Sequence, residues 1–110
     1  MLFRSASHVT LALDAASLPL IPGVVAMVGE NKSGGMGTNH EHFAAGIEFG
    51  PDVTAELRDL VFDPQTSGGL FFSVDPAEAD KALAALKGAG VPACFVGTVE
   101  IEGGSRLRIS

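Results

Sequence analysis

The loop DPQTSGGL, residues 63–70, holds the residue types in this chain that are best suited to binding a ligand. Its consecutive small residues expose backbone N–H groups that can surround an anion, and Thr66 and Ser67 add hydroxyl donors. Asp63 could hold a cation or orient a neighbouring donor. The same residues also suit a simple helix-to-strand connection, because Asp and Pro initiate turns and two glycines allow close packing. It is not a P-loop, since the chain has no G-x-x-x-x-G-K-[ST] sequence.

A second glycine-containing segment, SGGMGTN at residues 33–39, could close over a ligand with Thr38 and Asn39. It also suits a mobile surface loop, and its composition leaves both interpretations open. The residues of the two segments that could contact a phosphate or a nucleotide are Asp63, Gln65, Thr66, Ser67, Gly68, Gly69, Gly34, Gly35, Thr38 and Asn39.

The sequence predicts no metal site and no catalytic residue in this chain. His40 and His42 would share one face on a strand but would diverge on a helix. No Cys or Asp lies nearby at ligand spacing, and zinc normally takes three or four protein ligands. A solvated polar stretch is therefore the better interpretation. Cys94, the single cysteine, is predicted to be a small buried hydrophobe on a strand.

Five strands and three helices are predicted to position these segments. The strands are expected at residues 8–14, 47–49, 70–74, 93–99 and 106–109. The helices are expected at residues 22–28, from 52 or 54 to about 62, and 75–88. Residues 29–39 are expected to hold no regular element because of their glycines. A buried stripe on the middle helix is predicted from Val53, Leu57, Leu60 and Val61.

The last third of the chain carries the clearest local signals. Residues 70–74 are nearly all apolar, which is typical of a strand covered on both faces. Asp75 is a predicted N-cap, with Pro76 at the first helical position and Glu78 completing a capping box. The buried stripe of this helix is predicted to comprise Ala79, Ala82, Leu83 and Leu86, with Gly88 ending the helix.

A turn at residues 102–105 predicts a hairpin between strands 93–99 and 106–109, in which the second is an edge strand carrying Arg106 and Arg108. Interleaved helices and strands that end in a hairpin indicate an α+β fold, a mixed sheet with helices packed on it. A length of 110 residues predicts a single domain over residues 1–110.

The composition excludes several classes of function. Hydrophobic residues make up 46 %, enough for a core, and the net charge is -6. An acidic surface argues against nucleic acid and against anionic membranes as partners. No apolar run approaches the roughly 20 residues of a membrane-spanning helix, and no signal peptide is evident. A cytoplasmic location is therefore expected.

The octapeptide at residues 63–70 resembles the signature of the C-terminal domain of selenophosphate synthetases (selenide, water dikinases). These enzymes belong to the superfamily of aminoimidazole ribonucleotide synthetase. Residues 18–23, LPLIPG, look like the family's L-P-x-x-P-G segment, and Gly34, Gly35 and Asn39 are similar to its P-G-G-T-x-x-N loop. Two positions differ, since Ser33 and Met36 stand where the family usually has Pro and Thr. The resemblance covers nearly all of the chain.

This resemblance implies the fold of part of that C-terminal domain and a reaction in which ATP, selenide and water give selenophosphate, AMP and phosphate, with magnesium. In the family, the N-terminal domain carries the metal-binding aspartates, most ATP contacts and the reactive Cys or selenocysteine. That domain is not among these 110 residues, and Cys94 does not stand at the reactive position. We therefore expect no activity and no cofactor in this chain alone.

Three hypotheses follow from the resemblance. The chain is a synthetase domain that works with a partner chain carrying the N-terminal domain, or it is a non-catalytic interaction module, such as a homo-oligomer. The third possibility is a small-ligand domain that keeps a phosphate contact in the two glycine-containing segments.

Overall fold

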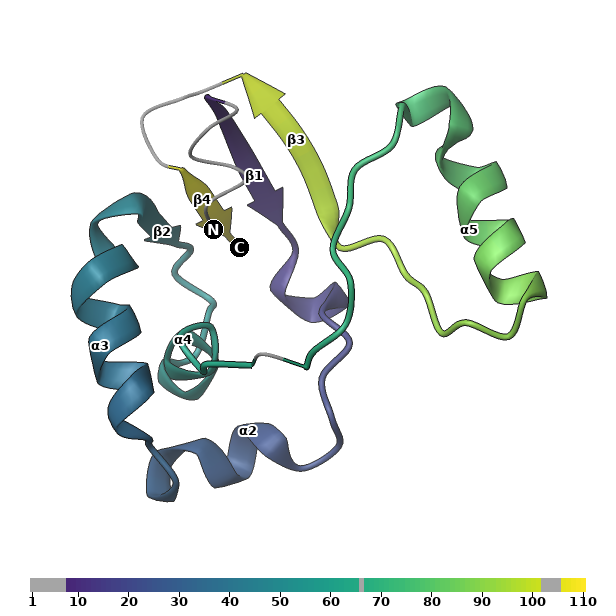
Figure 1. The fold of residues 1–110 in the computed structure, drawn as a ribbon. Coiled ribbons are helices and arrows are strands. Elements are labelled where there is room, and N and C mark those ends of the chain that lie inside the picture. The colour runs from purple at the N-terminus through teal and green to yellow at the C-terminus, as the bar shows by residue number, and fades with distance from the viewer. Residues whose placement is uncertain (1–7, 66, 102–105) are drawn as a thin grey trace.

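A mixed sheet forms the centre of the computed structural model, which describes residues 8–65, 67–101 and 106–110 (Figure 1). Within these residues the sheet has four strands in the order β2-β4-β1-β3. The strands are β1 (Val9–Leu13), β2 (Ile47–Phe49), β3 (Gly97–Ile101) and β4 (Leu107–Ile109). β1 is antiparallel to β3 and parallel to β4, and β2 is parallel to β4.

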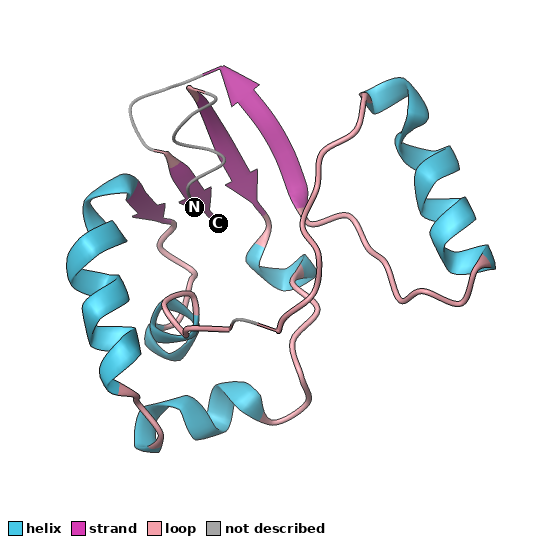
Figure 2. Ribbon diagram, viewed as in Figure 1, coloured by secondary structure: helices cyan, strands magenta, loops and turns pink. Residues whose placement is uncertain are grey.

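Helices surround one end and one side of this sheet (Figure 2). They are α2 (Val24–Met27), α3 (Gly34–Phe43) and α4 (Ala55–Leu60), whereas a fourth helix, α5 (Ala79–Gly88), lies away from the sheet. Short 3-10 turns lie at Ala15–Ser17, Val28–Glu30, Ala44–Gly46 and Pro76–Glu78. The predicted α+β class with a mixed sheet is therefore confirmed. Within the described ranges, each helix is too short or too polar to cross a lipid bilayer.

The core consists of two clusters of buried side chains that α4 connects. One contains Val28, Met36 and Leu60, and the other contains Val53, Leu107 and Ile109. Leu57, on α4, packs against both clusters. The helix begins after Thr54, whose Oγ1 accepts a hydrogen bond of 3.3 Å from the N–H of Leu57. The predicted apolar stripe of this helix is confirmed, with Val53 and Leu60 buried, and Leu57 and Val61 partly buried.

The prediction that residues 29–39 hold no regular element is wrong, because α3 begins at Gly34. Ser33 is its N-cap, and its Oγ accepts a hydrogen bond of 3.3 Å from the N–H of Met36. Met36 is only 5 % exposed and packs with Val28 and Leu60. Each glycine disfavours a helix by about 1 kcal/mol relative to Ala. Burial of the Met36 side chain offsets a large part of that penalty, and the cap contributes further.

The prediction that residues 106–109 form an edge strand in a hairpin with residues 93–99 is also wrong. β4 lies inside the sheet, between β2 and β1, and is parallel to both. Leu107 and Ile109 are 8 % and 1 % exposed, so both apolar side chains fill the core from a central position. Between them, Arg108 forms an ion pair of 2.9 Å with Glu100 of β3. The predicted turn at residues 102–105 lies outside the described residues.

The strand predicted at residues 70–74 is not formed. Leu70 is 94 % exposed, and Phe71 and Phe72 are each 59 % exposed. Among the described residues, this stretch forms no backbone–backbone hydrogen bond. An apolar run indicates that a segment needs a neighbour, but it does not specify which one. Within the part of the chain that the structure describes, no neighbour buries this segment.

α5 stands apart from the sheet in Figure 1. Asp75 caps its entrance as predicted, because its Oδ1 accepts a hydrogen bond of 2.8 Å from the N–H of Ala77. The predicted capping box is not formed, since Glu78 pairs with Lys81 at 3.0 Å. The residues of the predicted buried stripe are only partly buried.

The C-terminal end of α5 forms a Schellman motif. The N–H of Gly90 donates to the carbonyl of Lys87, and the N–H of Val91 donates to that of Leu86, both at 3.0 Å. The left-handed residue of the motif is Gly90, with φ 75°, and not Gly88.

The strand predicted at residues 93–99 is displaced toward the C-terminus, since β3 spans Gly97–Ile101. Cys94 therefore lies in the connection before β3 and is exposed, which contradicts its predicted burial. Its Sγ lies 3.7 Å from the carbonyl oxygen of Ser17.

Candidate functional site

The two glycine-containing segments lie against each other. Asn39, on α3, donates a hydrogen bond of 2.9 Å from Nδ2 to the carbonyl oxygen of Phe62, immediately before Asp63. At Gly35, an added Cβ would lie 2.8 Å from Cγ of Pro64, so the helix and the loop are in close contact there. We call residues 34–39, 63–65 and 67–69 the two-segment site. Thr66, also a predicted site residue, lies outside the described residues.

On the helical side of the site, the candidate side chains are already engaged. Thr38 is exposed, and its Oγ1 donates a hydrogen bond of 3.2 Å to the carbonyl of Gly34 in its own helix. Asn39 is half-buried and holds Phe62. The N–H of Met36 in the first turn of α3 already donates to Ser33. The groups left for a ligand are the backbone N–H groups of Gly34 and Gly35 in the same turn, which have no partner inside the helix. They lie at the positive end of the helix dipole and favour an anion.

On the loop side, Asp63 is half-buried, and its Oδ2 accepts a hydrogen bond of 3.1 Å from Nε2 of Gln65. The Gln65 side chain also lies against Gly68, where an added Cβ would be 3.4 Å from Oε1. Ser67, Gly68 and Gly69 are exposed. The loop therefore presents the Ser67 hydroxyl and small residues to solvent, while Asp63 and Gln65 stabilise its start.

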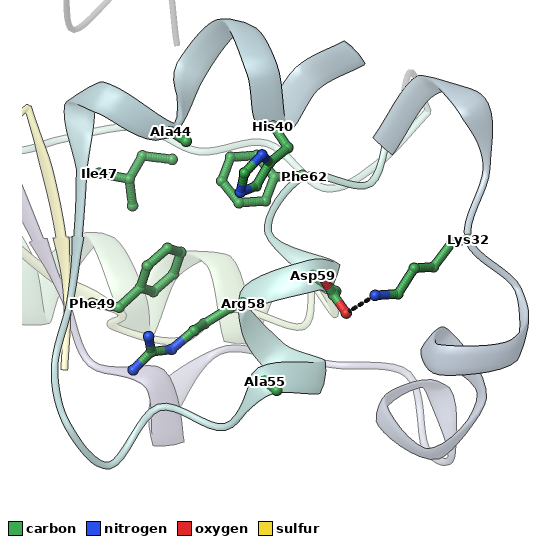
Figure 3. A pocket seen from close by; sticks show the side chains of 9 residues that line it. All are labelled: Lys32, His40, Ala44, Ile47, Phe49, Ala55, Arg58, Asp59 and Phe62. Carbon is green, nitrogen blue, oxygen red and sulfur yellow. Dashed lines mark ion pairs between the residues drawn. The ribbon is translucent and has the colours of Figure 1, made fainter. Parts of the chain in front are cut away.

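A pocket of about 490 Å³ lies beside the two-segment site (Figure 3). Its aromatic wall is the buried ring of Phe62, which packs edge-to-face on His40 at 4.8 Å and on Phe49 at 6.3 Å between centroids. The other residues that line it are Lys32, Ala44, Ile47, Ala55, Arg58 and Asp59.

Arg58 lines this pocket, but its guanidinium group is hydrogen-bonded to backbone carbonyls. Its Nε donates to the carbonyl of Val53 and its Nη2 to that of Gly50, each at 3.0 Å. The guanidinium also lies 5.3 Å from the ring centroid of Phe49. Sequence reasoning missed this role, because a polar residue outside the apolar stripe of a helix is usually solvated.

An ion pair lies at the rim of the pocket, where Nζ of Lys32 is 2.5 Å from Oδ2 of Asp59 (Figure 3). His40 and His42 lie on a helix and diverge, since His40 packs on Phe62 and His42 packs on Phe43 at 4.9 Å. In the described part of the chain, no three His, Cys, Asp or Glu side chains are placed to hold one metal ion.

The two-segment site is suited to contact with a phosphate group. Helix N–H groups, glycine N–H groups and a serine hydroxyl are all donors to an anion. The same site offers one carboxylate, Asp63, whereas Mg²⁺ takes near-octahedral oxygen ligands and phosphoryl transfer requires metal ions around the phosphates. The site residues therefore fit a phosphate, and they do not by themselves fit a magnesium site.

The contact between Gly35 and Pro64 gives a first prediction. We expect Gly35→Ala to lower the free energy of unfolding by about 1–3 kcal/mol, because the new methyl group would overlap a proline ring. Gly37→Ala is the matched control, since an added Cβ there meets nothing within 4 Å. It should raise stability by about 0.5–1 kcal/mol through helix propensity. Urea unfolding followed by circular dichroism measures both, and equal effects would contradict the close approach.

Comparison with known proteins shows the family to which this chain belongs. A family model described as AIR synthase related protein, C-terminal domain, matches residues 4–110. The chain is 41 % identical over 107 residues to a selenide, water dikinase of Nitratidesulfovibrio vulgaris (strain Miyazaki F), covering 94 % of this chain and 31 % of that protein. A selenide, water dikinase of Pelobacter propionicus is 40 % identical over 103 residues, with 93 % and 26 % covered.

A third relative, the selenide, water dikinase of Agathobacter rectalis, is 37 % identical over 90 residues, which covers 81 % of this chain and 26 % of the relative. The chain thus spans about 30 % of the length of these relatives and matches their C-terminal domain. Because the family model matches nearly all of its residues, the chain belongs to the family of AIR synthase related proteins, C-terminal domain.

Proposed function

We propose that this chain acts as the C-terminal-domain portion of a selenide, water dikinase, and that its two-segment site contacts phosphate groups of ATP. The family reaction converts ATP, selenide and water to selenophosphate, AMP and phosphate. One observation carries the proposal: the hydrogen bond of 2.9 Å from Asn39 to the carbonyl of Phe62, which joins segments 23 residues apart. Both segments present donors suited to an anion.

The charges of this chain indicate which phosphate and metal contacts its own residues could make. The donors to phosphate oxygens would be the N–H groups of Gly34 and Gly35, the Ser67 hydroxyl and the N–H groups of Gly68 and Gly69. When bound, ATP with magnesium supplies the phosphoryl group. The net charge of -6 and the single site carboxylate leave the metal ligands and the positive clamp to a partner chain that carries the N-terminal domain. We therefore expect no turnover from this chain alone, and a cytoplasmic location remains a prediction from composition.

Titration of the isotope-labelled chain with magnesium ATP, followed by NMR, tests the contact. We expect the amide signals of Gly34, Gly35 and Ser67–Gly69 to shift. Ser67→Ala should weaken binding roughly tenfold, because it removes one hydrogen bond to a charged group, worth about 1.5 kcal/mol or more.

Ser73→Ala is the matched control, because Ser73 is an exposed serine in the same connection outside the site. It should leave the affinity unchanged. If a folded chain shows no shifts in either segment at saturating ATP, these segments are scaffold and the phosphate contact is refuted.

A second candidate function is that of an interaction module. The observation that favours it is that large apolar side chains in residues 70–101 are exposed to solvent. The most exposed of them are Leu70, at 94 %, and Ile101, at 93 %. Such exposure is unusual for a monomer of this size.

A further inference from the structure

Among the described residues, β3 leaves one edge of the sheet without a neighbouring strand. It is the last strand in the order β2-β4-β1-β3, and each of its five residues is exposed. The N–H of Asp14 donates to the carbonyl of Val96 at 2.9 Å, so Asp14 and Val96 are a hydrogen-bonded pair of the β1–β3 ladder. In an antiparallel ladder, every second residue of a strand forms hydrogen bonds with the same neighbour. Thr98 and Glu100 therefore direct their backbone groups to β1. Gly97, Val99 and Ile101 direct theirs to the open edge.

This edge lacks the features that prevent edge-to-edge pairing. Natural edge strands carry lysine, proline or a bulge, whereas β3 has the sequence GTVEI. Its one charged side chain, Glu100, is held by Arg108 through contacts of 3.0 and 2.9 Å inside its own sheet. Val99 lies opposite Leu11, which packs against the core cluster, so the apolar face of the sheet continues onto β3. There Val99 is 48 % and Ile101 is 93 % exposed.

The size of the exposed surface fits a missing protein partner. The chain exposes 7780 Å² at a mass of 11.3 kDa, whereas a compact monomer of that mass exposes about 5,700 Å². Its radius of gyration is 14.7 Å, against about 13 Å for a compact chain of this length. The excess is about 2,000 Å², and a stable dimer needs only about 800 Å² from each partner.

We propose that a second copy of this chain docks on this edge, with the two β3 strands antiparallel across a two-fold axis at Val99. Val99 then lies opposite Val99 of the second copy, and Gly97 lies opposite its Ile101. This register uses the outward N–H and C=O groups of all three residues, as an antiparallel ladder requires. It also places Glu100 opposite Thr98, so no like charges face each other. An isologous contact of this kind closes at two copies and joins the sheets into one.

Analytical ultracentrifugation of the chain over a wide range of concentrations tests the proposal, together with amide hydrogen exchange. We expect a mass of twice 11.3 kDa at high concentration and slow exchange at Val99 and Ile101. Val99→Lys places two like charges at the axis and should weaken dimerisation at least tenfold, or about 1.4 kcal/mol. Thr98→Lys is the matched control, because it adds the same charge opposite Glu100 of the second copy. It should leave the dimer intact.

Each other outcome overturns the proposal. A monomer at all concentrations with fast exchange at Val99 would mean that no second copy binds this edge and that its partner, if it has one, is a different protein. A monomer with slow exchange at Val99 would mean that a segment of the same chain, such as residues 70–74, covers the edge. A dimer that Val99→Lys and Thr98→Lys weaken equally would mean that the copies meet elsewhere.

Discussion

Gly97→Ala is expected to lower the free energy of unfolding by about 3 kcal/mol or more, the upper range for an overpacked site. An added Cβ at Gly97 would lie 1.9 Å from the carbonyl oxygen of Ala12 and 2.9 Å from Cα of Leu13. These are backbone atoms and cannot rotate away. β1 and β3 would have to separate where Leu13 pairs with Gly97. Because small domains are stable by only about 5–15 kcal/mol, a large unfolded fraction should follow.

Urea unfolding monitored by circular dichroism measures this loss, with Gly88→Ala as the matched control. Gly88 is the last residue of α5, and an added Cβ there meets nothing within 4 Å. Its replacement should leave the midpoint unchanged or raise it slightly. If Gly97→Ala unfolds at the same urea concentration as the unaltered protein, the register of β1 against β3 is wrong.

Ile109→Ala is expected to lower the free energy of unfolding by about 2–5 kcal/mol, because it opens a cavity at the centre of the sheet. Ile109 is 1 % exposed and packs with Val53 and Leu107. It lies on β4, between β2 and β1, so neighbours on both sides limit how far the cavity can close. The same chemical change at Ile21, which is 76 % exposed, should cost less than about 0.5 kcal/mol.

Differential scanning calorimetry of the two variants separates burial from side-chain chemistry. Thermal midpoints that fall equally for Ile109→Ala and Ile21→Ala would contradict the central place of β4. That result would favour the edge position that the sequence predicts for residues 106–109.

Two positions at which the chain departs from the family pattern have structural roles. Ser33, where the resemblance predicts Pro, caps α3, because its Oγ accepts a hydrogen bond of 3.3 Å from the N–H of Met36. Met36, where the family usually has Thr, is buried in the core. Both substitutions act on the folding of α3, whose first turn carries the N–H groups assigned to phosphate contact.

Local patterns were sufficient for the elements whose signals lie within one window of sequence. The alternation of residues 8–14 predicts β1, and the stripe of Val53, Leu57 and Leu60 predicts α4 and its buried face. Asp75 marks the entrance to the last helix. The octapeptide at residues 63–70 identifies the family, because a signature of eight residues with collinear flanks is specific. These features depend on the alternation of apolar and polar residues, on helix caps and on a short exact sequence. They can be predicted without knowing which distant residues are in contact.

Only the tertiary structure decided which segments are neighbours. Burial of Met36, together with the Ser33 cap, offsets the penalty of the glycines in α3. Burial of Leu107 and Ile109 accompanies the central place of β4 in the sheet. The pairing of Asn39 with the carbonyl of Phe62 builds the two-segment site from residues 23 positions apart. An apolar run such as residues 70–74 states only that a partner is needed. Its partner depends on contacts between distant parts of the chain or between chains, which no local pattern specifies.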